Sequence, residues 1–131
     1  MTYKVFRELY IHACLSTDFN EFARSAREVD GFTEDLAETG MLFSIWLYSV
    51  DTSSTKVREF AGTTRAQFCR DYGLQERTVA NWDLKKTDPP EWALHLLCYA
   101  VLNRIYEEKD TARANLEIKN PAPRLPSQGQ K

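Results

Sequence analysis

Apolar residues recur every three or four positions through most of this chain, and no other feature constrains its fold as strongly. This spacing lines up apolar side chains along one side of an α-helix, whereas a half-buried strand needs strict alternation. The pattern predicts a first helix over residues 3–15 and a second over 19–30. A third helix is expected from Thr33, which can cap it, to about Val50, with a bend or a restart at Gly40.

The second half of the chain follows a polar linker at residues 51–54 and shows shorter helical patterns. Gly62 and Gly73 punctuate these patterns, and Pro89 and Pro90 open a longer one, because proline fits the first turn of a helix. The last twelve residues, NPAPRLPSQGQK, hold three prolines and predict an extended tail. We therefore expect helices at about residues 55–61, 64–72, 75–84 and 91–109.

The composition agrees with an all-α fold and shows where a polyanion would bind. There are only 5 glycines and 5 prolines, too few for a sheet protein rich in tight turns. The formal net charge is −2, but residues 1–62 carry 6 basic and 10 acidic side chains, whereas residues 63–131 carry 11 basic and 9 acidic ones. A negatively charged partner such as DNA would therefore meet the second half.

The longest apolar run, Met41–Val50, is too short to span a bilayer, and the N-terminus lacks the basic head and apolar stretch of a signal peptide. The run is apolar nearly all round, which is typical of a helix at the centre of a core or in a contact between chains, and the core is favoured. The 3 cysteines are widely spaced and odd in number, which argues against a disulfide framework. These observations predict a cytoplasmic protein without a membrane segment.

The most informative segment is Arg65–Trp82, which reads as two helices joined by a tight turn at Gly73. Glycine leaves a helix with positive φ without strain. The spacing about this glycine fits a helix-turn-helix, in which a small residue at Cys69 lets the two helices touch. The predicted buried positions of this unit are Phe68, Cys69, Leu74, Val79 and Trp82, and its core motif also includes Gly73 at the turn.

The other side chains of the second helix in this unit are polar. Arginine can pair with guanine, asparagine and glutamine with adenine, and glutamate can accept a hydrogen bond from cytosine. The second helix of such a unit lies in the major groove, and the first crosses the phosphate backbone. The outward-facing residues are Gln75, Glu76, Arg77, Thr78 and Asn81. For Glu76, the alternative is a surface charge or a salt bridge to Arg77.

This segment resembles the Xre/Cro-type helix-turn-helix family of phage and bacterial repressors, over about residues 54–102. The stretch TKVREFAGTTRAQF looks like the first helix of the family leading into the second, TVANWD like the end of its recognition helix, and DPPEWALHLL like its final packing helix. The resemblance implies sequence-specific binding of double-stranded DNA by a homodimer. It makes Gln75, Glu76, Arg77 and Asn81 base-reading candidates, and it implies phosphate contacts by Thr64, Arg65, Lys85 and Lys86.

The sequence departs from the family pattern in two places. Where the family has Glu and then Gly after the tryptophan, this chain has Asp83 and Lys85, so the turn that leaves the recognition helix is expected to differ. The first fifty residues have no counterpart in the minimal family. The predicted organisation is thus an N-terminal helical segment at 1–50, a compact helix-turn-helix domain of four to five helices at 54–109, and a tail at 110–131.

Catalysis, a cofactor and a metal site are not expected. The chain has no Gly-rich phosphate loop after a strand, no GxSxG and no HExxH. Its 2 histidines are not beside an obvious nucleophile. His95 and Cys98 share one helix face with Cys69 as the third possible ligand, but zinc needs four, so core packing is the favoured interpretation of these side chains.

The sequence therefore predicts a transcriptional regulator, a repressor, that reads the major groove with the helix at about 75–84. A second hypothesis assigns the acidic residues 1–50 to a protein partner, as in an antitoxin that masks a toxin. A third is an adaptor protein whose helix-turn-helix does not bind DNA. The dimer contact could come from the N-terminal helices, the helix at 91–109 or the tail.

Overall fold

A computed structural model of the chain describes residues 1–119, which form eight helices and no strand. The all-α prediction is therefore confirmed for this part of the chain. Of the predicted tail at 110–131, residues 110–119 are instead part of the last helix, and residues 120–131 lie outside the described residues. The helices are α1 (Tyr3–Leu15), α2 (Phe19–Ala26), α3 (Glu34–Glu38), α4 (Met41–Val50), α5 (Ser54–Ala61), α6 (Arg65–Tyr72), α7 (Glu76–Asp83) and α8 (Glu91–Lys119).

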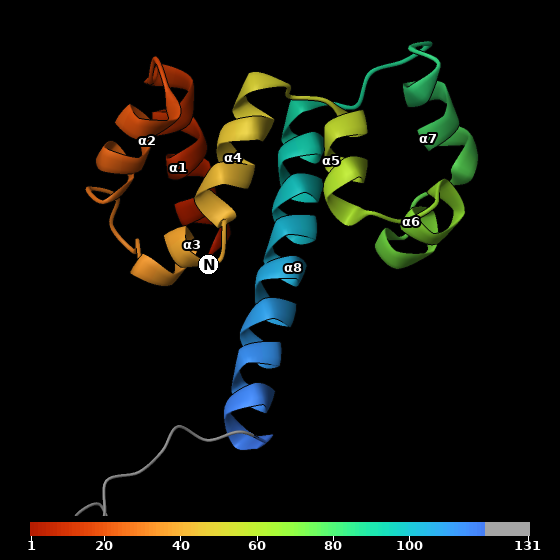
Figure 1. Cartoon of the computed structure of the whole chain (residues 1–131). Coiled ribbons are helices and arrows are strands. Elements are labelled where there is room, and N and C mark those ends of the chain that lie inside the picture. The colour runs from red at the N-terminus through yellow and green to blue at the C-terminus, as the bar shows by residue number, and fades with distance from the viewer. Residues whose placement is uncertain (120–131) are drawn as a thin grey trace, which may run out of the picture.

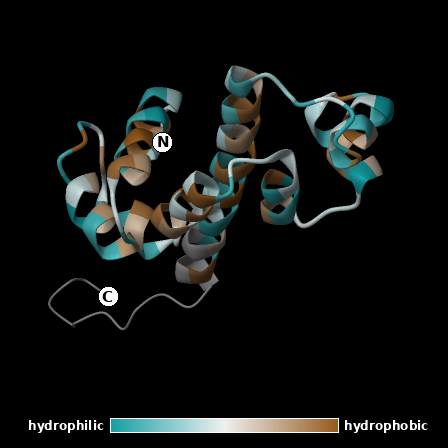
Figure 2. Ribbon diagram, turned by 90° about the horizontal axis from the view of Figure 1, so that it is seen from above, coloured by the Kyte–Doolittle hydropathy of each residue, from teal (hydrophilic) through white to brown (hydrophobic). Residues whose placement is uncertain are grey.

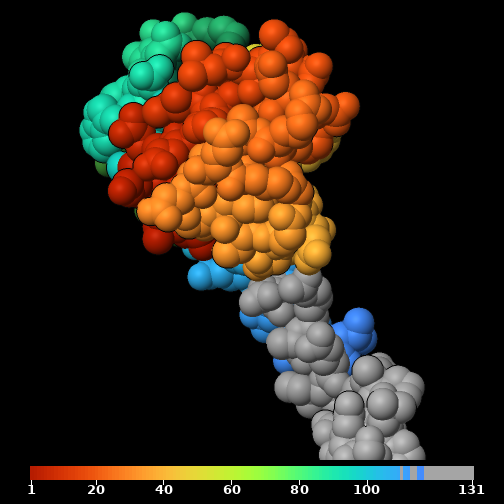
Figure 3. Space-filling model, turned by 90° about the vertical axis from the view of Figure 1, so that its left-hand side faces the viewer, coloured from red at the N-terminus to blue at the C-terminus, as the bar shows by residue number. Residues whose placement is uncertain are grey.

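The long helix α8 is the axis of the molecule, with one group of helices on each side (Figure 1). Helices α1 to α4 form an N-terminal lobe on one side, and α5 packs against the other side of α8 (Figure 1). Helices α6 and α7 lie beyond α5, at the greatest distance from the N-terminal lobe (Figure 2). The end of α8 projects below both groups, and the N-terminal lobe seen from its outer side forms a continuous surface above it (Figure 3).

Side-chain caps fix where four of the helices begin. Thr2, Asp18, Ser53 and Thr64 each have extended backbone angles and accept a hydrogen bond from the backbone N–H three residues later. The cap predicted at Thr33 differs, because its hydroxyl makes no such bond although the residue holds the N-cap position of α3. That helix is only five residues long. Its first-turn acids, Glu34 and Asp35, interact favourably with the positive end of the helix dipole and thereby stabilise the N-terminus of the helix.

Gly40 divides the segment that the sequence predicts as one helix with a bend or restart. It has φ +84° and separates α3 from α4. A residue with a side chain is strained in this left-handed conformation, so glycine allows a sharp change of direction here. The apolar run after it becomes α4, in which Met41, Leu42, Ile45 and Tyr48 are buried and Phe43 is half exposed.

The core is one continuous cluster to which both sides of α8 contribute. Phe6, Leu9 and Phe22 of the N-terminal lobe are fully buried, as are Val101 and Leu102 of α8. The same cluster includes Val57 of α5 and Phe68 of α6. Residues 1–50 and 54–109 thus share a core rather than folding around two separate ones.

A buried polar network joins α1, α4 and α8 inside this core. The Tyr48 hydroxyl lies 2.8 Å from Nδ1 of His95, and the Tyr10 ring packs against the His95 ring. The Thr52 hydroxyl donates to the Tyr48 carbonyl at 2.8 Å and lies 3.2 Å from the Tyr10 hydroxyl. Burial lowers the pKa of His95 below its usual 6.5, although the nearby Glu91 raises it.

The free energy of unfolding should fall as the pH drops below about 6.5, because the unfolded chain then binds a proton that buried His95 resists. The melting temperature should therefore be lower at about pH 5.5 than at about pH 7.5. In His95→Asn, whose Oδ1 can replace Nδ1 as the acceptor for Tyr48, this difference should shrink. His12→Asn is the matched control and should keep it. An undiminished difference in His95→Asn would assign the pH dependence to other groups.

Helix α8 continues to Lys119, whereas the sequence analysis expected its end near Lys109. Residues 110–119 hold neither glycine nor proline, and the first proline is Pro121, so nothing in the sequence stops the helix earlier. Two contacts fix α8 to the α3 end of the N-terminal lobe at this level: the Tyr106 hydroxyl donates to Asp35, and Lys109 donates to the Thr39 carbonyl at 2.8 Å. Within residues 1–119, α8 and the other helices fall short of the length and apolarity that crossing a membrane requires.

Candidate nucleic-acid interface

Helices α6 and α7 are both short and are joined by a tight turn, as the sequence pattern around Gly73 predicts. Gly73 has φ +69° and ends α6, and the N–H groups of Gly73 and Leu74 both donate to the Cys69 carbonyl. A Cβ at this position would meet no atom within 4 Å. The backbone angle, and not lack of space, therefore requires glycine here.

The wedge between α6 and α7 is closed by small and apolar side chains. Phe68 and Val79 are almost completely buried, and Cys69 is 3% exposed. Burial raises the pKa of the Cys69 thiol, which is therefore neutral and packs as a small apolar group. Leu74 is half-buried and packs against the main core.

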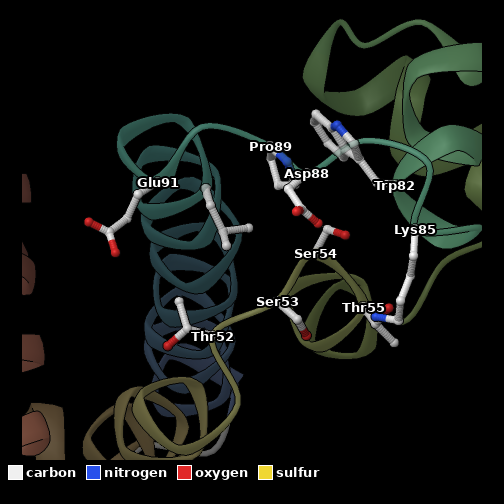
Figure 4. Close-up of a pocket in the computed structure, with 10 residues that line it drawn as sticks. Thr52, Ser53, Ser54, Thr55, Trp82, Lys85, Asp88, Pro89 and Glu91 are labelled. Carbon is white, nitrogen blue, oxygen red and sulfur yellow. The ribbon is translucent and has the colours of Figure 1, made fainter.

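Trp82 differs from the prediction that it is buried in this wedge. It is only partly buried and lies in the last turn of α7, where its ring faces Pro89 in the loop to α8 (Figure 4). Val79, one turn earlier, already fills the space next to α6, so the indole extends beyond the wedge towards the loop.

The outer face of α7 presents the predicted base-reading side chains to solvent. Gln75, Glu76 and Arg77 are exposed, and Thr78 and Asn81 are half-buried. Gln75 is the N-cap residue and precedes the helix, which begins at Glu76 rather than at Gln75. Glu76 occupies the first turn, where its charge is favourable to the helix dipole. Within residues 1–119 it forms no ion pair with Arg77.

An ion-pair network fixes the orientation of α7 relative to α5 and α6, and the sequence analysis did not find it. Asp83, the last residue of α7, accepts a hydrogen bond from Arg58 of α5 at 2.7 Å and from Arg65 of α6 at 3.3 Å. Asp83 and Arg58 are both largely shielded from solvent, so their pair is less screened than a surface pair. Asp83 appeared in the sequence only as a departure from a family pattern.

The predicted phosphate contacts occupy two positions around α7. Thr64 caps α6 through its hydroxyl, and Arg65 follows in the first turn with 45% of its side chain exposed. Arg65 shares the Asp83 carboxylate with Arg58, so a phosphate would compete with Asp83 for its guanidinium. Lys85 and Lys86 are exposed just after α7.

Lys85 adopts the conformation for which glycine is usual at the end of a helix. It has φ +58°, and within residues 1–119 it is the one residue other than glycine with positive φ. The N–H of Lys85 donates to the Trp82 carbonyl at 3.1 Å, and that of Lys86 to the Asn81 carbonyl at 2.9 Å. This pair of hydrogen bonds is the Schellman motif. The turn after α7 therefore has the same geometry as one with glycine at this position. The prediction that Lys85 would give a different turn from the family pattern is wrong.

Lys85→Gly should raise the free energy of unfolding by about 0.5–1 kcal/mol, because it removes the steric cost of the left-handed conformation. Lys86→Gly is the matched control, since it removes the same charge at a position without positive φ. It should lower the free energy of unfolding by about 0.5 kcal/mol. Urea unfolding followed by circular dichroism measures both. If both variants were destabilised equally, Lys85 would carry no strain.

The described residues offer no metal centre. Within residues 1–119, no group of three or more His, Cys, Asp and Glu side chains is arranged to hold a metal ion. Cys98 and His95 are buried on α8, and burial raises the pKa of the Cys98 thiol, which disfavours the thiolate that a metal would need.

Comparisons of the chain with models of protein families, with curated proteins and with solved structures found no match.

Proposed function

We propose that this protein is a sequence-specific DNA-binding regulator, a repressor, that places α7 in the major groove of double-stranded DNA. The observation that carries the proposal is the outer face of α7. Its exposed polar side chains stand opposite buried Val79, on a helix that follows α6 through a tight glycine turn. Such a face presents donors and acceptors that match base edges in the major groove.

Contacts in both halves of α7 support its proposed role as the recognition helix. Its N-terminal half is fixed by Val79 against α6, and its C-terminal end is fixed by Asp83 between Arg58 and Arg65. Base readout depends on hydrogen bonds of defined geometry, so a recognition helix must keep a fixed orientation relative to the rest of the domain. Thr64 and Arg65 at the start of α6, and Lys85 and Lys86 after α7, supply the proposed phosphate contacts that set the register.

We further propose that two copies bind one operator, with half-sites about one turn of DNA apart. One α7 covers too few base pairs for high specificity. Trp92 and Leu96, one turn apart on α8, are 67% and 43% exposed and support a contact between copies. Sedimentation of the protein with its duplex should give two chains per duplex, and one chain would contradict the homodimer.

The experiment is selection of a random duplex pool by the purified full-length protein at near-physiological salt. The expected result is enrichment of a two-fold symmetric consensus sequence. A run with Arg77→Ala should relax or lose the consensus at one position in each half-site. Absence of enrichment with a folded, soluble protein would exclude sequence-specific binding by the protein alone.

One observation favours a second candidate function, the binding of a protein partner by residues 1–50. Ile11 and Leu15 are one turn apart on α1 and are 46% and 80% exposed, which places apolar surface on the N-terminal lobe. An antitoxin or an adaptor would use such a surface. In that case Leu15→Asp should abolish partner binding and leave the DNA consensus unchanged.

A further inference from the structure

A groove of about 300 Å³ lies where α5, the loop after α7 and the start of α8 meet (Figure 4). Figure 4 shows Trp82 and Pro89 on one side of this groove and the segment from Ser53 to Thr55 on the other. Leu94 of α8 also contributes to its wall. This volume is at the lower end of the range of small-molecule pockets, about 300–1,000 Å³.

One polar side chain of this groove, that of Ser54, takes no part in the hydrogen bonds of the described fold. Ser54 is only 7% exposed and lines the groove, and within residues 1–119 its hydroxyl makes no hydrogen bond to another protein group. Its neighbour Ser53, by contrast, caps α5 by accepting from the Lys56 N–H. The Ser54 hydroxyl oxygen is not fully shielded from solvent, so it is open to a hydrogen bond from a ligand in the groove.

Two opposite charges line the groove without neutralising each other. Figure 4 shows the Asp88 carboxylate turned towards Ser54 and the Lys85 side chain extending to Thr55, whereas the Glu91 carboxylate points away. Within the described residues, neither Asp88 nor Lys85 takes part in an ion pair. The positive end of the α5 dipole, at Ser54 and Thr55, also faces the groove.

We propose that this groove binds a free amino acid, a small zwitterion whose two charges match its two ends. The ligand carboxylate would lie at Lys85 and the first turn of α5, and its ammonium group at Asp88. Ser54 would hydrogen bond the ligand between these ends, and Trp82 and Leu94 would cover its apolar part.

The groove is placed to couple the ligand to α7, and this part of the inference rests on the proposed function. Trp82 belongs to α7, and Lys85 belongs to the turn that ends it. A ligand that binds both of these residues together with Ser54 of α5 would favour one orientation of α7. It would thereby change the affinity for DNA, because a ligand shifts an equilibrium by its difference in affinity for the two states.

The test measures binding to the full chain without DNA, so it succeeds or fails independently of the proposed function. Each standard L-amino acid is added separately, and the melting temperature and the heat of titration are recorded. At a concentration of about ten times its Kd, the bound amino acid should raise the melting temperature by about 4 °C. Its methyl ester, which lacks the carboxylate, and its N-acetyl form, which lacks the ammonium charge, should both fail to bind.

Variants then assign the binding to the groove. Ser54→Ala and Asp88→Asn should each weaken binding about tenfold, because each removes one polar contact. Asp30→Asn removes the same charge as Asp88→Asn but lies in the N-terminal lobe, and it should leave binding unchanged. The proposal is overturned if no amino acid binds, if the ester or the acetyl form binds equally well, or if Ser54→Ala and Asp88→Asn both bind like the parent protein.

Discussion

Replacing Arg77 with alanine should weaken binding to the selected duplex by about 1–3 kcal/mol, or roughly 5- to 150-fold in Kd. The Arg77 side chain is exposed on α7 and takes part in no ion pair within residues 1–119, so its loss removes no contact that supports the fold. The free energy of unfolding should therefore change by no more than about 0.5 kcal/mol. The two quantities are measured by fluorescence anisotropy of a labelled duplex and by urea unfolding.

The pattern of the loss identifies the role of Arg77. A base contact should lower affinity for the consensus and leave affinity for an unrelated duplex almost unchanged, whereas a phosphate contact should lower both. Arg24→Ala removes the same charge from α2 in the N-terminal lobe and should change neither affinity. Equal losses on both duplexes would contradict base readout by Arg77.

Phe6→Ala should destabilise the protein by about 3–5 kcal/mol, the largest effect on stability that we expect from a single substitution. The Phe6 side chain is fully buried, and its ring centroid lies 5.8 Å from that of Tyr99 and 6.3 Å from that of Tyr48. Alanine would leave a cavity where α1, α4 and α8 meet. Phe43→Ala is the matched control: this side chain is 50% exposed, so its loss should cost no more than about 1.5 kcal/mol.

The Phe6→Ala variant also tests whether the molecule unfolds as one unit. The core cluster runs from Phe6 through α8 to Val57 and Phe68, so destabilising the N-terminal lobe should also lower the protection of α6 amides from hydrogen exchange. Unchanged protection in α6, together with faster exchange in α1, would show that the two sides of α8 open independently.

The helices and the turn at the candidate site could be predicted from local patterns. Helical spacing located each helix except the last ten residues of α8, and Gly40 and Gly73 marked chain reversals because few other residues adopt their positive φ. The exposure of Arg77 on α7 also follows from the helical spacing of apolar residues alone, because Val79 fixes which face of the helix is buried.

Features that depend on residues far apart in the chain could not be predicted in this way. Asp83 meets Arg58 across 25 positions, and nothing local to either residue indicates the contact. The groove beside Trp82 forms only when the start of α8 lies next to α5. The positive φ of Lys85 was missed because lysine rarely adopts it, and the hydrogen bonds that impose it belong to the whole turn.

Helix α8 lies between the N-terminal lobe and α7, so the elements that carry the two candidate binding surfaces are on opposite sides of it (Figures 1 and 2). Ile11 and Leu15 belong to α1, so a protein bound there and a duplex bound by α7 would contact helices on different sides of α8. Under the two proposals together, one helix would be the spacer between two bound macromolecules. In such an arrangement the two candidate functions are not rivals, because a regulator on its operator could recruit a second protein to the same stretch of DNA.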